Sequence, residues 1–242
     1  MKTALITGCS DGGIGAAMAK ILREKDYYVF AALRNYNVDI LELDVTSDAS
    51  IKQCAGQVQA RTGGTLDILV NNASRDFLMP LLDVNINEAK EFFDVNFWAA
   101  LAVTQAFAPM VIKSKGIILN HSSVVWNLAI AWGGIYSTSK AALKQLSDVL
   151  RVELELLGVR VVTAVIGAVD TNIFSNSHPD ALRMPSNSYY EPIRQFLSFI
   201  WRGTTATTCR WLSGWLPLWL LDMLNNGARG ITKLRQYYAK RP

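Results

Sequence analysis

The sequence predicts an α/β fold: a doubly wound parallel sheet in a three-layer α/β/α arrangement, formed by a single domain. Three observations lead to this class. Short apolar runs alternate with segments whose apolar residues return every three or four positions. Such alternation is typical of parallel strands that are joined by helices and covered on both faces. The chain has 242 residues, half of them hydrophobic, which is enough for one substantial core.

The apolar runs and the periodic segments set the expected order of elements. Strands are expected at residues 4–7, 28–33, 40–43, 68–71, 116–120 and 160–166. Helices are expected at residues 14–23, 50–61, 87–112 and 135–157. Only residues 35–39 separate the second expected strand from the third. Beyond Asn172 the periodicity ends, so the core of the fold is expected within residues 1–175.

A glycine-rich segment lies between the first expected strand and the first expected helix. It reads Thr7-Gly8-Cys9-Ser10-Asp11-Gly12-Gly13-Ile14-Gly15. Glycines in this position let the backbone approach a pyrophosphate, and the helix N-terminus favours its charge. The segment therefore predicts a Rossmann-type dinucleotide site, although an ordinary glycine-rich turn is the simpler alternative.

Arg34 bears on which dinucleotide is bound. It follows the second expected strand, about where a carboxylate would hold the ribose hydroxyls of NAD. An arginine there suits a 2′-phosphate, so the sequence favours NADP(H), with a solvated surface arginine as the alternative.

Ser123, Tyr136 and Lys140 form the candidate catalytic group. Tyr136 and Lys140 are four residues apart, so both side chains lie on one face of a helix, and the ammonium should lower the pKa of the phenol. A phenol of lowered pKa is a more efficient general acid at neutral pH. Ser123, thirteen residues before Tyr136, could hydrogen-bond the same carbonyl oxygen. An exposed helix with an ordinary Tyr and Lys is the alternative.

These motifs together resemble the short-chain dehydrogenase/reductase family over residues 3 to about 175. Asn71-Asn72-Ala73-Ser74 resembles the Asn-Asn-Ala-Gly of the family, and the resemblance makes Asn96 the fourth catalytic residue beside Ser123, Tyr136 and Lys140. The residues that it implies for cofactor binding are Gly8, Ser10, Gly12, Gly13, Ile14, Gly15, Arg34, Asp44, Val45, Asn72, Ala73, Tyr136, Lys140, Val169 and Thr171. It makes residues 1–175 the dinucleotide-binding and catalytic core, and residues 176–242 a substrate loop and an apolar C-terminal segment of the same domain.

Within the family, the glycine segment and the apolar C-terminus look most like the fungal NADPH-dependent 1-acyldihydroxyacetone phosphate reductases and their relatives. That resemblance implies reduction of a ketone on a hydrophobic substrate, either an acyldihydroxyacetone phosphate or a fungal natural-product intermediate. A phosphate-bearing substrate should need a basic contact, for which Arg183, Arg194 and Arg202 are candidates.

The segment 211–224 is apolar, with Trp211, Trp215 and Trp219 four residues apart. It is too short to span a bilayer, but a helix there would present an indole ridge suited to a lipid headgroup boundary. A lid or a subunit contact is the alternative. The N-terminus lacks the pattern of a signal peptide. We therefore expect a cytoplasmic protein, peripheral on the endoplasmic reticulum or lipid droplets if this segment binds lipid.

Composition limits the remaining partners. The net charge is +4 and the basic residues are dispersed, which argues against nucleic-acid binding. The three cysteines lack metal-ligand spacing, so no metal site is expected. The long expected helices at 87–112 and 135–157 offer faces for a homodimer or homotetramer, as in many family members.

Two other functions compete with carbonyl reduction. Gly8-Cys9-Ser10-Asp11-Gly12 also fits the Gly-x-Ser-x-Gly turn of esterases and lipases. Hydrolysis through Ser10 would need a histidine base, and the chain has only His121 and His178. The third hypothesis is a nucleotide-binding protein without turnover.

Overall fold

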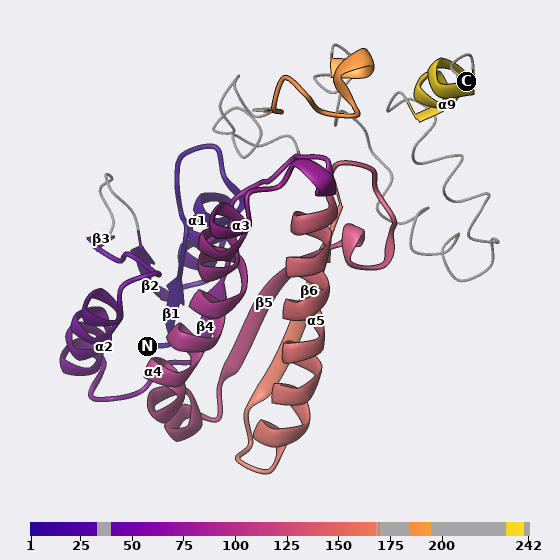
Figure 1. Cartoon of the computed structure of the whole chain (residues 1–242). Coiled ribbons are helices and arrows are strands. Elements are labelled where there is room, and N and C mark those ends of the chain that lie inside the picture. Colours follow the sequence, from indigo (N-terminus) through magenta and orange to yellow (C-terminus); the bar gives the residue numbers. More distant parts are fainter. Residues whose placement is uncertain (33–39, 168, 170–183, 195–230, 240–242) are drawn as a thin grey trace.

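The computed structural model describes residues 1–32, 40–167, 169, 184–194 and 231–239 (Figure 1). Six parallel strands form one sheet in the order β3-β2-β1-β4-β5-β6. The strands are β1 (Thr3–Ile6), β2 (Tyr28–Ala32), β3 (Ile40–Leu41), β4 (Ile68–Asn71), β5 (Ile117–Ser123) and β6 (Arg160–Ile166). The order reverses between β1 and β4, so the carboxyl ends of these strands flank the crevice in which doubly wound folds bind ligands.

Helices connect the strands and lie along the sheet. They are α1 (Ile14–Glu24), α2 (Asp48–Thr62), α3 (Ile86–Phe93), α4 (Ala99–Ser114), α5 (Gly134–Glu155) and, further on, α9 (Ile231–Ala239). Four short helical turns complete the described elements: η1 (Leu81–Asp83), η2 (Asp94–Trp98), η3 (Val124–Asn127) and η4 (Glu191–Ile193). The predicted strands and helices all form, most with bounds shifted by one to three residues.

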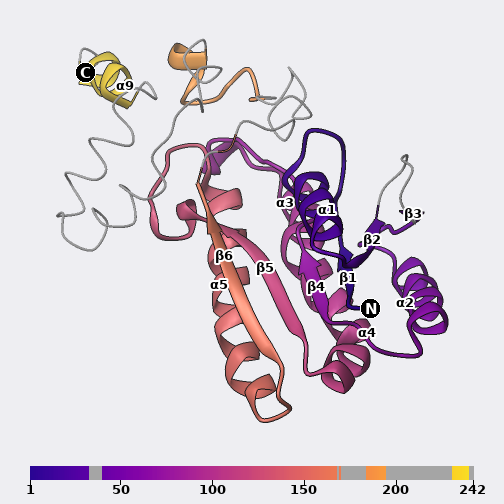
Figure 2. The same ribbon diagram turned by 180° about the vertical axis from the view of Figure 1, so that it is seen from behind.

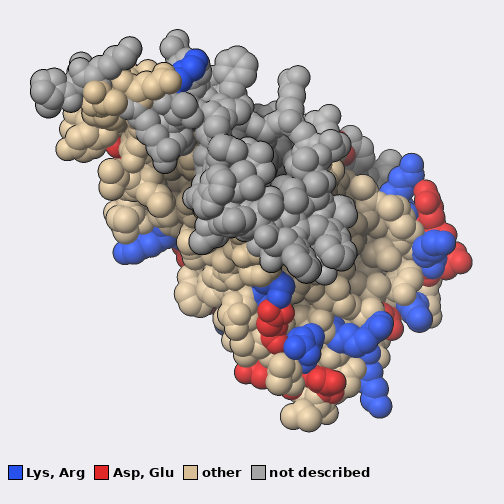
Figure 3. All heavy atoms as spheres, turned by 90° about the vertical axis from the view of Figure 1, so that its right-hand side faces the viewer, with Lys and Arg blue, Asp and Glu red and all other residues tan. Residues whose placement is uncertain are grey.

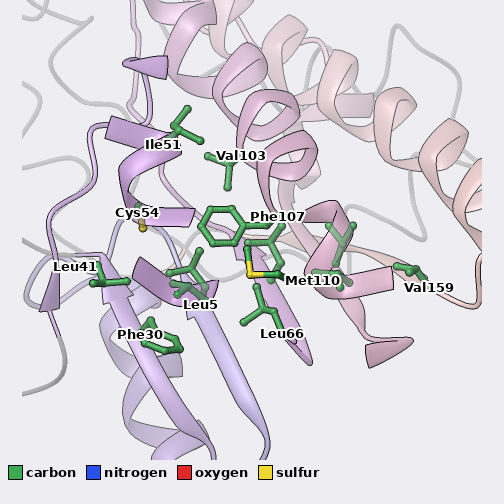
Figure 4. Packing of buried hydrophobic residues seen from close by; sticks show 14 of the residues in the cluster. Leu5, Phe30, Leu41, Ile51, Cys54, Leu66, Val103, Phe107, Met110 and Val159 are labelled. Carbon is green, nitrogen blue, oxygen red and sulfur yellow. The ribbon is translucent and has the colours of Figure 1, made fainter. Parts of the chain in front are cut away.

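Side chains alternate along the strands and so divide the core between the two faces of the sheet. Leu5 of β1 and Phe30 of β2 are fully buried on the face covered by α2, α4 and α5 (Figure 1). Phe107 and Met110 of α4 belong to the same cluster, whose side chains Figure 4 draws between the strands and the helices. One cluster therefore joins the strands to three helices.

The opposite face carries smaller side chains. Ala4 and Ile6 of β1 and Val29 of β2 are buried there, against Ala19 of α1. Figure 2 views this face, on which α1 lies over the first strands. Towards β6 the covering by described residues ends, and Val162 is 43% exposed although the preceding Val161 is 7% exposed. Within the described residues, helices thus cover one face more fully than the other.

The helical run from Ile86 to Ser114 is long and apolar enough, by length and composition alone, to cross a membrane. Its apolar side chains Val103, Phe107 and Val111 are buried in the core cluster, so packing against the sheet explains the apolar residues on that side of the run.

On the face shown in Figure 3, the described acidic and basic side chains are interspersed.

One feature of this run differs from the expected single helix at 87–112. The i to i+5 turn η2, a π-helical turn, separates α3 from α4. Such turns occur mostly as one-residue insertions in α-helices, and they change the direction of the side chains they contain. Asn96 lies in the middle of η2 and is 1% exposed.

Candidate active site

The glycine segment forms a close-packed loop between β1 and α1. Gly8 has φ +67°, and a Cβ atom there would lie 2.6 Å from the Cα atom of Ala73. A Cβ atom at Gly15 would lie 2.5 Å from Nδ2 of Asn72 and 2.7 Å from the carbonyl oxygen of Gly8. At these two positions only glycine fits without displacement of the neighbouring chain.

The start of α1 faces this loop without a capping side chain at its N-cap position. The N-cap residue Gly13 makes no side-chain hydrogen bond to the helix, and the first turn contains no acidic residue. Such a terminus presents free donors and the positive end of the helix dipole. The loop and the helix start therefore fit the diphosphate of a dinucleotide, as the sequence predicted.

Asn72 and Thr7 fasten the glycine loop to the end of β4. Nδ2 of Asn72 donates to the carbonyl oxygens of Thr7 (2.8 Å) and Gly8 (2.7 Å). The hydroxyl of Thr7 accepts hydrogen bonds from the backbone N–H groups of Asn72 and Ala73, both at 3.0 Å. Asn71 points the other way, into the interior, where its Nδ2 donates to Oδ1 of Asn120 (2.8 Å).

The three predicted catalytic side chains meet in one pocket. Ser123 ends β5, Tyr136 lies in the first turn of α5, and Lys140 follows one turn later. Ser123 is hydrogen-bonded to the hydroxyl of Tyr136. The ammonium of Lys140 lies 5.7 Å from the centre of the Tyr136 ring and donates to the carbonyl oxygen of His121 (3.1 Å). The strand end and the helix start thus bring the predicted triad together.

The ionisation of Tyr136 differs from the expectation based on spacing. Burial, and secondarily the charge of Asp76, raise the pKa of Tyr136 to about 12, against a smaller lowering by the Ser123 hydrogen bond. Burial also lowers the pKa of Lys140 to about 8. The expected lowering of the Tyr136 pKa by Lys140 is therefore wrong for this pocket, because desolvation outweighs the lysine. The phenol consequently keeps its proton at neutral pH and is a proton donor.

Asn96 is brought near the triad but holds the backbone of a neighbouring segment. Its Oδ1 accepts from the N–H of Arg75 (2.8 Å), and its Nδ2 donates to the carbonyl oxygen of Arg75 (3.0 Å). Nδ2 also reaches the hydroxyl of Ser139 (3.4 Å), which in turn donates to the carbonyl oxygen of Tyr136 (2.7 Å). Asn96 therefore positions the segment after β4 against the start of α5.

The pocket joins these groups to the glycine loop. The predicted residues that line it are Ile14, Asn72, Ser123, Tyr136, Lys140 and Val169. The remaining lining residues were not among the predicted catalytic or cofactor-binding residues of the reductase, namely Ser74, Asp76, Leu78, His121, Ser122, Val124, Val125, Ile130, Gly133, Ser137, Ile166 and Gly167. Several of these follow the carboxyl end of β4, β5 or β6, which is the general signal that could have indicated them.

Other predicted residues lie elsewhere along the same edge of the sheet or outside the described part. Asp44 and Val45 follow β3, and Oδ1 of Asp44 accepts from the N–H (2.9 Å) and the hydroxyl (2.7 Å) of Thr46. Arg34 and Thr171 lie outside the described residues, as do Arg183, Arg202 and the apolar segment 211–224. Their predicted roles stay predictions.

The surroundings of His121 do not support a role as the base of a hydrolase. Its Nδ1 is hydrogen-bonded to Oδ1 of Asn72 (2.8 Å). Burial, and secondarily the charge of Lys140, lower the pKa of His121 to about 4, so it is a poor proton acceptor at neutral pH. His178 lies outside the described residues.

The sheet order, the glycine loop and the adjoining pocket are features of the oxidoreductases that bind dinucleotides on a doubly wound sheet. Comparison with known proteins narrows this class to a single family. A model of the short chain dehydrogenases matches residues 2–182, and the chain belongs to that family. The predicted family and fold class are thereby confirmed.

The similar proteins are fungal enzymes and solved reductases. A short-chain dehydrogenase of Talaromyces islandicus is 50% identical over 203 residues, which cover 80% of this chain and 72% of the relative. An NADPH-dependent 1-acyldihydroxyacetone phosphate reductase of Schizosaccharomyces pombe is 35% identical over 207 residues, 81% of this chain and 70% of that one. The NADPH-bound carbonyl reductase from chicken fatty liver superposes with a TM-score of 0.66 at 26% identity, over 75% of this chain and 85% of that one.

Proposed function

We propose that the protein is an NADPH-dependent carbonyl reductase that acts on a ketone of a hydrophobic substrate. The observation that carries the proposal is the pocket in which Ser123, Tyr136 and Lys140 meet beside Ile14 of the glycine loop and beside Asn72, which is hydrogen-bonded to that loop. A carbonyl oxygen placed between the hydroxyls of Ser123 and Tyr136 has a proton donor and a second hydrogen-bond donor within reach.

Side chains of this protein carry out the proton transfer to the substrate oxygen. Tyr136 holds a proton at neutral pH and gives it to the substrate oxygen as negative charge develops there. Ser123 donates a hydrogen bond to the same oxygen. The ammonium of Lys140, fixed by the carbonyl oxygen of His121, stabilises the phenolate that proton transfer leaves behind. Bound NADPH supplies the hydride.

The choice of NADPH rests on Arg34 and on the relatives. A guanidinium suits the 2′-phosphate of NADPH, whereas binding of the NAD ribose usually relies on a carboxylate. The relative from Schizosaccharomyces pombe is named for its NADPH dependence, and the chicken carbonyl reductase was solved with NADPH bound. In a kinetic comparison we expect a higher kcat/KM for NADPH than for NADH, and Arg34→Ala should reduce that ratio.

A hydrophobic substrate is supported by the lining of the pocket. Beyond the polar triad, the pocket wall is largely aliphatic, with side chains from Leu78, Val124, Val125, Ile130, Ile166 and Val169. Apolar pockets with a few convergent polar groups orient a hydrophobic ligand by the polar groups and bind it by burial of its apolar surface.

Oxidation of NADPH by the purified protein, with a series of hydrophobic ketones, tests the proposal. Tyr136→Phe removes the proton donor, and we expect it to lower kcat by about 10²- to 10⁴-fold while NADPH still binds. Tyr189→Phe is the matched control, because it removes the same hydroxyl from a side chain that is 69% exposed and does not line the pocket. NADPH binding without turnover of any ketone, or full activity of Tyr136→Phe, contradicts the proposal.

A further inference from the structure

The side chain of His121 lines the pocket but has no part in the proposed proton transfer. It lies in β5, two residues before Ser123, and is 6% exposed. Nδ1 of its ring is hydrogen-bonded to Oδ1 of Asn72 (2.8 Å), whereas its backbone carbonyl oxygen accepts from the ammonium of Lys140 (3.1 Å). One residue therefore contacts both the side chain that holds the glycine loop and the lysine of the catalytic group.

Asn72 is the side chain through which His121 can act on the glycine loop. Both hydrogens of its Nδ2 are used, on the carbonyl oxygens of Thr7 (2.8 Å) and Gly8 (2.7 Å). The same Nδ2 would be 2.5 Å from a Cβ atom at Gly15, so the amide is packed against the start of α1 as well. The torsion that turns an asparagine amide has broad minima, and a tilt of this amide would lengthen both bonds to the loop.

The hydrogen bond from His121 opposes such a tilt. It holds Oδ1, the opposite edge of the amide, while the loop holds Nδ2. Because Oδ1 can only accept, Nδ1 of His121 is the donor. The backbone of His121 is fixed in turn, since this residue pairs with Ala164 of β6. A strand of the sheet thereby fixes the amide that fastens the glycine loop.

We propose that His121 is a positioning residue for cofactor binding, because its hydrogen bond to Asn72 keeps the glycine loop in the shape that accepts the diphosphate. This inference rests on the proposed use of a nicotinamide dinucleotide. His121 is not a catalytic residue in this scheme, since its side chain acts through Asn72 and not on the reacting atoms. Its effect is therefore expected in the affinity for the cofactor.

Fluorescence titration with NADPH and with NADH measures this effect without turnover. His121→Leu removes the donor to Asn72 and keeps the backbone carbonyl that binds Lys140. We expect the Kd of both cofactors to rise by about five- to tenfold. The factor should be the same for both, because the glycine loop and the helix start fit the diphosphate that they share. Arg34→Ala, in contrast, should raise the Kd for NADPH alone.

Two further variants separate positioning from a general loss of stability. His121→Asn keeps an N–H donor in place of Nδ1, so its Kd should stay within about twofold of the wild type. Ser147→Ala removes a hydroxyl that is 1% exposed and accepts from Nδ2 of Asn120 (2.8 Å), the residue before His121 in β5. It should destabilise the protein and leave the Kd unchanged. An equal loss of affinity in His121→Asn and His121→Leu, or a similar loss in Ser147→Ala, overturns the inference.

A double-mutant cycle shows whether His121 acts through Asn72. In the Asn72→Ala background the amide is absent, so the addition of His121→Leu should change the Kd by less than about twofold. The same factor in both backgrounds overturns the inference. If His121→Leu does not fold, His121→Phe replaces it, because phenylalanine keeps a ring and loses the donor.

The titrations also separate this inference from the proposed function. NADPH binding with an unchanged Kd in His121→Leu overturns the role of His121 and leaves carbonyl reduction standing. If the wild-type protein binds neither NADPH nor NADH, the proposed function fails and this inference fails with it. Turnover of no ketone despite NADPH binding contradicts the proposed function alone, since the comparison of Kd values needs no turnover.

Discussion

His121 makes the stability of the protein depend on pH in a predictable way. Asn72 uses both hydrogens of its Nδ2 on the carbonyl oxygens of Thr7 and Gly8, so its Oδ1 is an acceptor. Nδ1 of His121, 2.8 Å from that Oδ1, must then carry a hydrogen, which the Nδ1–H tautomer of the neutral imidazole supplies without a second proton. Burial, and secondarily the charge of Lys140, oppose a second proton and lower the His121 pKa from 6.5 to about 4.

The sign follows from proton binding by the two states. Between pH 6.5 and about 4 the unfolded chain binds a proton at His121 and the folded protein does not. The contribution to the free energy of unfolding is therefore complete above pH 6.5 and is lost as the pH falls towards 4. The difference in pKa corresponds to about 3 kcal/mol in total, of which about 2 kcal/mol is already lost at pH 5.

Substitution of His121 by Asn isolates this effect. The amide nitrogen of Asn can take the place of Nδ1 as donor to Asn72, but it does not titrate. Urea unfolding of both proteins at pH 7 and pH 5 gives the difference between their free energies of unfolding, in which carboxylates common to both cancel. We expect that difference to shift by about 2 kcal/mol against the wild type at pH 5. If that difference changes by less than about 0.5 kcal/mol between pH 7 and pH 5, the reasoning is refuted.

Three further outcomes follow from the site. Gly15→Ala places a Cβ atom 2.5 Å from Nδ2 of Asn72, so the Kd for NADPH should rise by about tenfold or more in a fluorescence titration, whereas Gly56→Ala, with no heavy atom within 4 Å, should leave it unchanged. Asn96→Ala removes the two hydrogen bonds from the Asn96 side chain to the backbone of Arg75, and it should lower the free energy of unfolding by about 2 kcal/mol. A loss below about 0.5 kcal/mol would contradict the role of Asn96 in positioning that segment. Because the Lys140 pKa is about 8, kcat/KM for reduction should decline above that pH, and Lys140→Arg, which stays charged, should not show that decline in its pH profile.

The fold was predictable because its signals are local. Leu5 and Phe30 alternate with Ala4 and Val29 along their strands, and the structure buries the two pairs on opposite faces of the sheet. The glycine segment was recognisable for a related reason, since a tight strand-to-helix turn requires glycine at particular positions. Gly15 illustrates this, because any side chain there would meet Asn72.

Sequence reasoning missed one local insertion and two features that depend on contacts between distant segments. The π-helical turn η2 adds a single residue within a helix, and the spacing of apolar residues does not reveal such an insertion. The partner of His121 is Asn72, which follows another strand, β4, so neither residue alone indicates the bond. Asp76 belongs to no motif, and its place in the pocket follows from where the segment after β4 passes α5.

The pKa of Tyr136 shows why spacing alone misjudged the chemistry. Four residues of helix do place Lys140 near the phenol, with 5.7 Å between the ammonium and the ring centre. Sequence spacing, however, carries no information on desolvation, which depends on how deeply the pocket buries both groups. Phe92 of α3, whose ring centre lies 6.4 Å from that of Tyr136, is one of the side chains that exclude water there.

The two pKa values together favour one direction of reaction. Reduction needs a protonated phenol and a charged lysine, and this combination persists at every pH below about 8, where Lys140 begins to lose its proton. Oxidation of an alcohol needs the phenolate together with the charged lysine. In the pocket without cofactor, the phenolate forms only near pH 12, well above the range in which Lys140 is charged. Burial therefore opposes the ionised form of both groups, and because the acid form of Tyr136 is the neutral one, burial favours the protonation state that the proposed reduction requires.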